Sequence, residues 1–201
     1  MSAAISFTAR EIAALHDRAT GLWHHDPDPH HIFGSDLFDV ILAQHRANFD
    51  LWHEEDRARA PRASDAEIAA VKRAIDRCNQ QRNDLIERCD AALLELLGKQ
   101  GLPNPAAELH SETPGLIVDR LSILSLKIYH TREEISRPGA PAGHAERNRE
   151  RLALLTEQRD DLLSCLDRFW NAILAGTQRF KLYRQLKMYN DPALNPAIYN
   201  G

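Results

Sequence analysis

Apolar residues recur with the 3.6-residue period of an α-helix along nearly the whole chain of 201 residues, and no segment shows a convincing β-strand alternation. This periodicity predicts an all-α fold. Because no shift in composition divides the chain, we expect a single domain over residues 1–201, a helical bundle of about five to six helices. The second, third and fifth helices should be long. The clearest helices are expected at about residues 8–20, 35–60, 64–97, 113–136 and 144–180.

Capping residues and helix breakers set these predicted bounds. Thr8 precedes the first helix, Ser64 and Glu67 form a capping box before the third, and Thr113 is followed by Pro114 at a helix start. Between the third and fourth helices lies a connection of about sixteen residues, 98–113, a length typical of binding loops and lids. We therefore expect that this connection could cover a site.

Charge and composition restrict the classes of partner. The chain has 25 Lys and Arg residues against 29 Asp and Glu, a net charge of −4, so no general positive field attracts nucleic acid or an anionic membrane. No apolar run reaches the roughly 20 residues of a membrane-spanning helix, and the N-terminus lacks a signal-peptide core. We expect a soluble, cytoplasmic protein. Cys78, Cys89 and Cys165 indicate neither a disulfide framework nor a thiolate zinc site.

The predicted helix at 113–136 combines an apolar sequence with polar groups that are costly to bury. At 100° per residue, Asp119, Arg120, Lys127, His130 and Glu134 share an arc of about 100°, while apolar residues fill most of the remaining circumference. Such an arc is either a strip that faces solvent, as charged residues usually do, or one wall of an interior polar pocket. Two apolar residues within the arc favour the pocket.

Two further predicted helices carry polar residues at faces that should be buried. On the helix at 64–97, Arg82 lies within the apolar face, and a stripe of amide and carboxyl groups borders it at Asp76, Asn79, Asn83, Glu87 and Asp90. On the helix at 35–60, the apolar face or its edge carries His45, Asn48, Glu55, Asp56 and Arg59. These residues form either a hydrogen-bond network that fixes helix register or the lining of a shared cavity.

We predict the cavity. Four residues of the helix at 113–136 should face the polar stripe of the helix at 64–97, namely Asp119, Arg120, Lys127 and His130. The ends of Arg120 and Lys127 should lie near its carboxylates and be shielded from solvent.

The residue types suggest a phosphorylated ligand, a nucleotide or a nucleotide sugar. Carboxylates suit Mg²⁺, and the predicted metal ligands are Glu55, Asp56, Asp76, Glu87 and Asp90. Guanidinium and ammonium groups suit phosphate, and the predicted ligand-binding residues are Asn79, Arg82, Asn83, Arg120, Lys127, His45, Asn48 and Trp52. His130 is the candidate for proton transfer, with Asp119 as a second catalytic candidate. Glu87 and Asp90 also have the ExxD spacing of all-α nucleotide pyrophosphohydrolases, although this spacing is common in helices.

Other constellations carry less information. The segment His24–His31 is rich in histidine and could bind a transition metal, but its two prolines make it a poor cage. Lys181, Arg184 and Lys187 could bind phosphate or nucleic acid, although such a basic run is more often a solvated face. The chain has no Glu-x-x-His pair, which argues against a ferritin-like di-iron site, and it lacks the GxGxxG, Walker A, HExxH and GxSxG motifs.

Four long motifs in order give the chain a resemblance to a known family. The segments NFDLWHEEDRAR at 48–59, IDRCNQQRNDLIERCD at 75–90, SETPGLIVDRLSILSLKIYH at 111–130 and YRQLKMYNDPALNPAIY at 183–199 resemble the bacterial domain-of-unknown-function family 4254, over about residues 36–199. The family has no established activity, and its members are associated with polysaccharide biosynthesis and glycosyltransferase neighbours.

The resemblance implies a role in cell-envelope polysaccharide metabolism. Two hypotheses follow. The chain is a metal-assisted enzyme or binder of a phosphorylated ligand, or it is a non-catalytic accessory protein for a glycosyltransferase, with the polar stripes as structural ion pairs. A homodimer is compatible with both.

Overall fold

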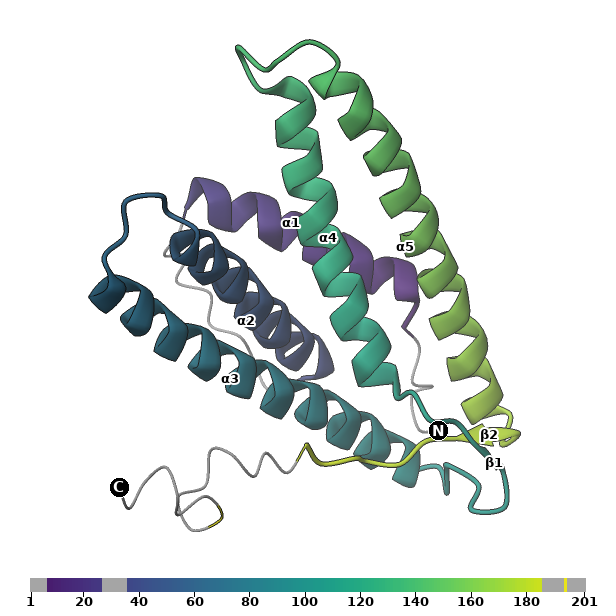
Figure 1. Ribbon diagram of the computed structural model, residues 1–201. Helices are drawn as coiled ribbons and strands as arrows, with labels where there is room; N and C mark the ends of the chain where they lie inside the picture. The colour runs from purple at the N-terminus through teal and green to yellow at the C-terminus, as the bar shows by residue number, and fades with distance from the viewer. Residues whose placement is uncertain (1–6, 27–35, 186–193, 195–201) are drawn as a thin grey trace.

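A computed structural model of the chain describes residues 7–26, 36–185 and 194. It confirms the all-α prediction, with five helices in the described residues (Figure 1). They are α1 (Ala9–His25), α2 (Leu37–Ala58), α3 (Asp65–Gly98), α4 (Pro114–Ser136) and α5 (His144–Leu174). Two strands of two residues each, β1 (Glu108–Leu109) and β2 (Gln178–Arg179), were not expected from the sequence.

Three of the helices begin with a capping box. The side chains of Thr8, Asp36 and Ser64 each accept a hydrogen bond from the backbone N–H three residues later, and a carboxylate at that position bonds back to the cap. At α4 the cap is Thr113, with Pro114 in the first turn, as the sequence predicts. The second helix therefore starts after Asp36 rather than at residue 35.

Two helix ends differ from the prediction. The first helix continues past Gly21 to His25, because glycine is tolerated inside a helix at a moderate cost and no proline occurs before residue 27. The fifth helix ends at Leu174 rather than near residue 180. There Gly176 adopts a left-handed conformation with φ of 71°, which turns the chain into β2.

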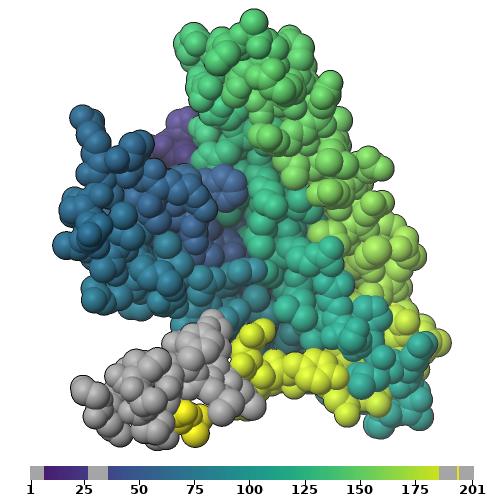
Figure 2. Space-filling model, in the orientation of Figure 1, coloured from purple at the N-terminus to yellow at the C-terminus, as the bar shows by residue number. Residues whose placement is uncertain are grey.

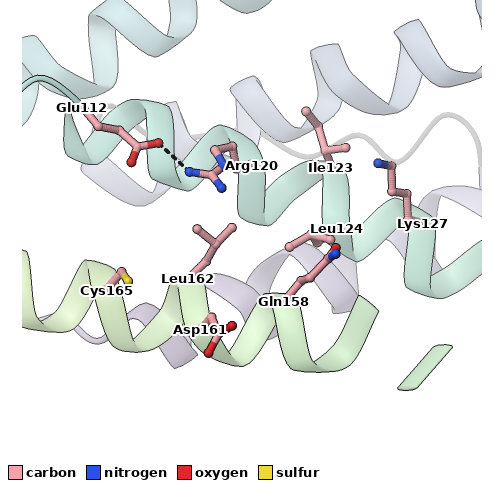
Figure 3. A pocket seen from close by; sticks show the side chains of 9 residues that line it. All are labelled: Glu112, Arg120, Ile123, Leu124, Lys127, Gln158, Asp161, Leu162 and Cys165. Carbon is pink, nitrogen blue, oxygen red and sulfur yellow. Dashed lines mark hydrogen bonds and ion pairs between the residues drawn. The ribbon is translucent and has the colours of Figure 1, made fainter. Parts of the chain in front are cut away.

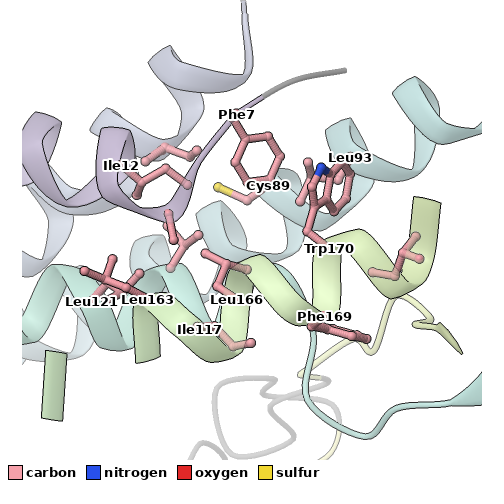
Figure 4. Close-up of a cluster of buried hydrophobic side chains, with 14 of the residues drawn as sticks. Phe7, Ile12, Cys89, Leu93, Ile117, Leu121, Leu163, Leu166, Phe169 and Trp170 are labelled. Atoms are coloured by element: carbon pink, nitrogen blue, oxygen red, sulfur yellow. The ribbon is translucent and has the colours of Figure 1, made fainter. Parts of the chain in front are cut away.

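The main core receives side chains from all five helices, and Figure 4 shows part of it. Ile12 of α1, Leu93 of α3, Leu121 of α4 and Leu166 of α5 are all almost fully buried there, together with the Trp170 ring. Full burial of such side chains contributes about 1.5 to 3 kcal/mol each. Since α4 is apolar over most of its circumference, it can contact neighbours on several sides at once.

The helices form two hairpins. α2 packs against α3 and α4 against α5, while α1 crosses behind both pairs and contacts α2, α4 and α5 (Figure 1). At the base, β1 and β2 pair in parallel and join the α3–α4 connection to the end of α5, with Glu108 opposite Gln178. Figure 2 shows the face on which α2 and α3 lie beside α4 and α5. This arrangement places α2, α3 and α4 around one polar interior.

Candidate functional site

The polar interior is centred on the carboxylate of Asp119, which is 3 % exposed. Its Oδ1 accepts hydrogen bonds from Arg82 Nε of α3 at 2.7 Å, Gln44 Nε2 of α2 at 2.5 Å and Asn48 Nδ2 at 2.9 Å. Its Oδ2 accepts a second bond from the Arg82 guanidinium, and these bonds raise the pKa of Arg82. The ion pair is therefore bidentate and satisfied by protein groups.

The same network extends to α1 through hydroxyl and imidazole groups. Ser122 Oγ accepts from Asn48 Nδ2 at 2.9 Å and lies 2.7 Å from His45 Nδ1, while His45 Nε2 lies 2.9 Å from the Thr20 hydroxyl. Burial lowers the pKa of His45 to about 3 and that of His16, stacked on it at 4.5 Å, well below its ordinary value. Both imidazoles are therefore neutral.

These contacts correct the predicted arrangement of the α3 and α4 stripes. Of the α4 residues expected to face α3, Asp119 does so, but Arg120 and Lys127 are exposed. Arg120 pairs with Glu112 at 2.8 Å in the α3–α4 connection, and its side chain is 54 % exposed. The physical reason is that Arg120 lies 100° around the helix from Asp119, so only one of them can point into the interface.

The polar stripe on α3 is likewise divided among different neighbours. Asp76 is exposed and pairs with Lys72 one turn earlier, and Glu87 accepts a bond from the backbone of Gln185 at 2.8 Å. Asn79 and Asn83 are half-buried. The stripe is not the wall of a closed cavity.

Asp90 lies at the N-terminus of α4. Its Oδ1 accepts from the Gly115 N–H at 2.7 Å, and the Thr113 side chain bonds to it as well. A Cβ on Gly115 would come within 2.8 Å of that oxygen and 2.9 Å of the Ile86 carbonyl oxygen, so glycine permits the close approach. Burial raises the pKa of Asp90 to about 6, and its two hydrogen bonds act in the opposite direction.

The five predicted Mg²⁺ ligands do not converge in the described part of the chain. Glu55 pairs with Arg59 at 3.0 Å and Asp56 is exposed beside it, whereas Asp76, Glu87 and Asp90 have the separate partners given above. Binding of Mg²⁺ stays a prediction.

Three hollows that share lining residues surround the outward face of α4; we call them together the α4 cleft. The first, about 650 Å³, lies between α4 and α5, with the Glu112–Arg120 pair at one end and Lys127 at the other (Figure 3). The second, about 470 Å³, is lined by α2, α3 and α4 residues that include Asn48, Trp52, Glu55, Asp56 and Arg82. The third, about 490 Å³, contains Trp52, Lys127, His130 and Glu134. Many predicted site residues therefore meet at a surface cleft rather than in the interior.

His130 also belongs to a group of three histidines that the sequence does not predict. His24 at the end of α1, His53 of α2 and His130 of α4 offer ring nitrogens that all lie within 4.8 Å of one another. It is the one group of three potential metal-ligating side chains within that distance in residues 7–26, 36–185 and 194. Burial, followed by the neighbouring His24 and His130, lowers the pKa of His53.

Sequence signals could have found part of these sites. Ser122 interrupts the apolar side of α4, and Gln44 precedes His45 on the buried face of α2, so both had the pattern of interior polar groups. For the three histidines, the segment rich in histidine was recognised, but His24 and His25 lie in α1 and His30 and His31 lie outside the described residues. Nothing in the spacing connects His24 with residues 53 and 130.

The basic C-terminal run is only partly described. Lys181 and Arg184 are exposed, whereas Lys187 and most of the motif at 183–199 lie outside the described residues. In the described residues, no helix has the length and apolar character needed to cross a membrane.

Comparison with known proteins gives a single assignment. No curated protein and no solved structure matches the chain significantly. One family model, described as "Protein of unknown function (DUF4254)", matches residues 39–182, which is well over half of the chain and includes α3, α4, α5 and nearly all of α2. This agrees with the resemblance of the motifs, and the chain therefore belongs to the DUF4254 family.

Proposed function

We propose that this protein binds a phosphorylated small molecule, of the nucleotide or nucleotide-sugar class, in the α4 cleft. The observation that supports this most directly is the position of Lys127, which is exposed and lines two of the three hollows. In the described parts of the chain, no carboxylate forms an ion pair with its ammonium group. A solvated ammonium where two hollows meet can contact a phosphate oxygen without first breaking a salt bridge.

The rest of the lining suits the uncharged part of such a ligand. Trp52 lines two hollows and offers an aromatic ring against which a sugar or base can pack. Glu55 and Asp56 can accept hydrogen bonds from hydroxyl groups. Because Glu112 and Asp161 also line the cleft, a ligand with many negative charges would be repelled, so we favour one or two phosphate groups.

Mg²⁺ and an envelope-polysaccharide setting remain parts of this proposal. Magnesium would reach the cleft with the phosphate, where Glu55 and Asp56 are the nearest predicted ligands on its lining. The setting is that implied by the family resemblance.

A second candidate function is favoured by the Asp119 network, in which Gln44, Asn48 and Arg82 all donate hydrogen bonds to the Asp119 carboxylate. Because Arg82 and Asp119 satisfy each other, these polar residues behave as the structural ion pairs expected of a non-catalytic accessory protein for a glycosyltransferase. In that case the α4 cleft would have no small-molecule ligand.

Calorimetric titration with inorganic phosphate, nucleoside diphosphates and nucleotide sugars, with and without Mg²⁺, separates the two functions. For a bound ligand, Lys127→Ala should weaken affinity about tenfold, which corresponds to one lost charge-assisted contact of about 1.4 kcal/mol. The matched control is Arg132→Ala, since Arg132 is also exposed on α4 but lines none of the three hollows.

Two outcomes would contradict the binding proposal. One is the absence of heat and of thermal stabilisation across the whole panel, which supports the accessory function. The other is equal weakening by Lys127→Ala and Arg132→Ala, which would show that only general charge matters.

A further inference from the structure

We propose that His24, His53 and His130 form a binding site for a transition-metal ion of the Zn²⁺ class. This site is independent of the phosphate proposal, because it uses none of the cations that would contact a phosphorylated ligand. It draws one ligand from each of three helices, α1, α2 and α4, and of the three only His130 also lines the α4 cleft.

In two of these histidines, His24 and His130, the hydrogen bond uses Nδ1 and leaves Nε2 free to bind a metal. His24 Nδ1 lies 2.7 Å from the carbonyl oxygen of Thr20, and His130 Nδ1 lies 2.8 Å from a carboxylate oxygen of Glu133. Both oxygens can only accept, so each Nδ1 of the neutral ring carries the proton and each Nε2 carries a lone pair. A metal-bound histidine usually donates its other ring N–H to a carbonyl or carboxylate oxygen in this way.

Both of these Nε2 atoms are buried without a hydrogen-bond partner. A buried acceptor left unpaired costs about 1 to 3 kcal/mol, so proteins rarely keep two of them side by side. A metal ion between the rings would satisfy both lone pairs at once. Both ring nitrogens of His16 are also buried without a partner, but His16 stacks only on His45, whereas three histidines here bring ring nitrogens within 4.8 Å of one another.

The positions of the rings also fit a metal. The ring centres are 5.3 Å apart for His24 and His53, 5.0 Å for His24 and His130, and 5.9 Å for His53 and His130. With Zn–N bonds of about 2.0 to 2.1 Å in tetrahedral geometry, ring centres should lie about 5 Å apart. Closing the site therefore needs only small side-chain rotations, chiefly of His53.

Neighbouring aromatic rings hold the ligands in place. Trp52 stacks on His130 with ring centres 4.8 Å apart, Tyr129 stacks on His24 at 4.3 Å, and Phe49 meets the edge of His53 at 4.5 Å. Such packing restricts the rotamers of the ligands, so less conformational entropy is lost when an ion binds.

Ligand chemistry selects the class of ion. Three imidazoles without a carboxylate favour Zn²⁺, Cu²⁺, Ni²⁺ or Co²⁺ over Mg²⁺ and Ca²⁺, which prefer oxygen. Three protein ligands leave a fourth position for solvent or a bound molecule, as in catalytic zinc sites. His130 then serves as a ligand rather than as the free proton-transfer group that the sequence suggested.

The experiment is a competition titration of Zn²⁺ with a chromophoric chelator, using the full chain after metal removal. We expect one tight site per chain. His53→Phe and His130→Phe keep an aromatic ring in the packed positions. Each should weaken binding about 100-fold or more, since a direct ligand matters at least as much as a group that only bonds to a ligand. Glu133→Gln should weaken it about tenfold through His130. The matched control His25→Ala, exposed in the same turn as His24, should leave affinity unchanged.

A second measurement tests geometry and folding together. Co²⁺ bound to the same site should give the strong visible absorption of a tetrahedral centre, and the His53→Phe protein should lose it while its helical circular dichroism stays unchanged. The proposal is overturned if the full chain binds no Zn²⁺ in the micromolar range, or if binding survives both phenylalanine substitutions, which would place the ion elsewhere.

Discussion

Asp90 of α3 and Gly115 in the first turn of α4 are joined by a hydrogen bond. The carboxylate was predicted as a metal ligand because of its residue type and its position on the α3 stripe. Its actual partner is a backbone N–H of another helix, at 2.7 Å. Sequence patterns cannot show such a bond, because every residue except proline carries the same backbone donor.

The raised pKa of Asp90 makes its contribution to stability dependent on pH. Between the ordinary value of 3.8 and the folded value of about 6, the folded protein keeps a proton that the unfolded chain releases. This contribution is full below about pH 4 and is lost as pH rises through about 6, an effect of about 3 kcal/mol at most. We therefore expect Asp90→Asn, which cannot titrate, to gain stability relative to the wild type between pH 4 and pH 7.

Urea unfolding at several pH values measures this difference. The control is Asp76→Asn, which changes an exposed carboxylate on the same helix and should give a difference that varies little with pH. If the free energy of unfolding depends on pH in the same way for the wild type and Asp90→Asn, the helix N-terminus and the two hydrogen bonds offset the cost of burying the charge.

At the scale of helices, the Asp119 network joins α2, α3 and α4. Of the polar residues that the sequence places on buried faces, His45, Asn48 and Asp119 are buried and Arg82 is partly buried, whereas Asp56 and Arg59 are exposed. The sequence did not predict their pairing, because helical periodicity gives directions around each axis but not the rotation of one helix against another. Arg120 and Lys127 therefore line a surface cleft although they were assigned to the interior.

Removing the Asp119 carboxylate should destabilise the protein strongly. Asp119→Ala leaves the Arg82 guanidinium and two amides without their acceptor, and loss of one partner from a buried ion pair costs about 3 to 5 kcal/mol. Glu112→Ala, which breaks the exposed pair with Arg120, should cost less than about 1 kcal/mol. Guanidinium unfolding of both variants tests the contrast.

If Asp119→Ala and Glu112→Ala lower the free energy of unfolding by equal, small amounts, water replaces the Asp119 carboxylate within the network. Asp119→Asn keeps an acceptor oxygen near Arg82. Its free energy of unfolding should therefore lie between that of the wild type and that of Asp119→Ala.

At the scale of the whole molecule, the matched family segment does not contain a complete core. It begins at residue 39, whereas α1 covers Ala9–His25 and buries Ile12 and Trp23 against the other helices. α1 also pairs with α5 through Asp17 and Arg159 at 2.9 Å. The helix itself was predictable from its cap and periodicity, but its central position was not, because no sequence signal tells which helices an N-terminal helix will cross.

A chain that lacks residues 1–26 should fail to fold cooperatively. Burial of Phe7, Ile12 and Trp23 contributes about 5 to 9 kcal/mol together, which is comparable to the total stability of about 5 to 15 kcal/mol expected for a domain. Calorimetry should show no sharp transition for the shortened chain. The control is Arg18→Ala, at an exposed position of α1, which should unfold like the wild type. A sharp transition in the chain that lacks residues 1–26 would contradict the role assigned to α1.

The parallel pairing of β1 with β2 brings together two points far apart along the chain, residues 109 and 178. In an unfolded polymer, closing a loop of that length costs about 4 kcal/mol of chain entropy, more than two residues of strand could supply. The α4–α5 hairpin removes most of this cost, because α5 packs along α4 and runs back toward the start of α4 (Figure 1). We therefore expect the pairing of β1 with β2 to depend on the packing of α4 against α5, which already holds these ends together.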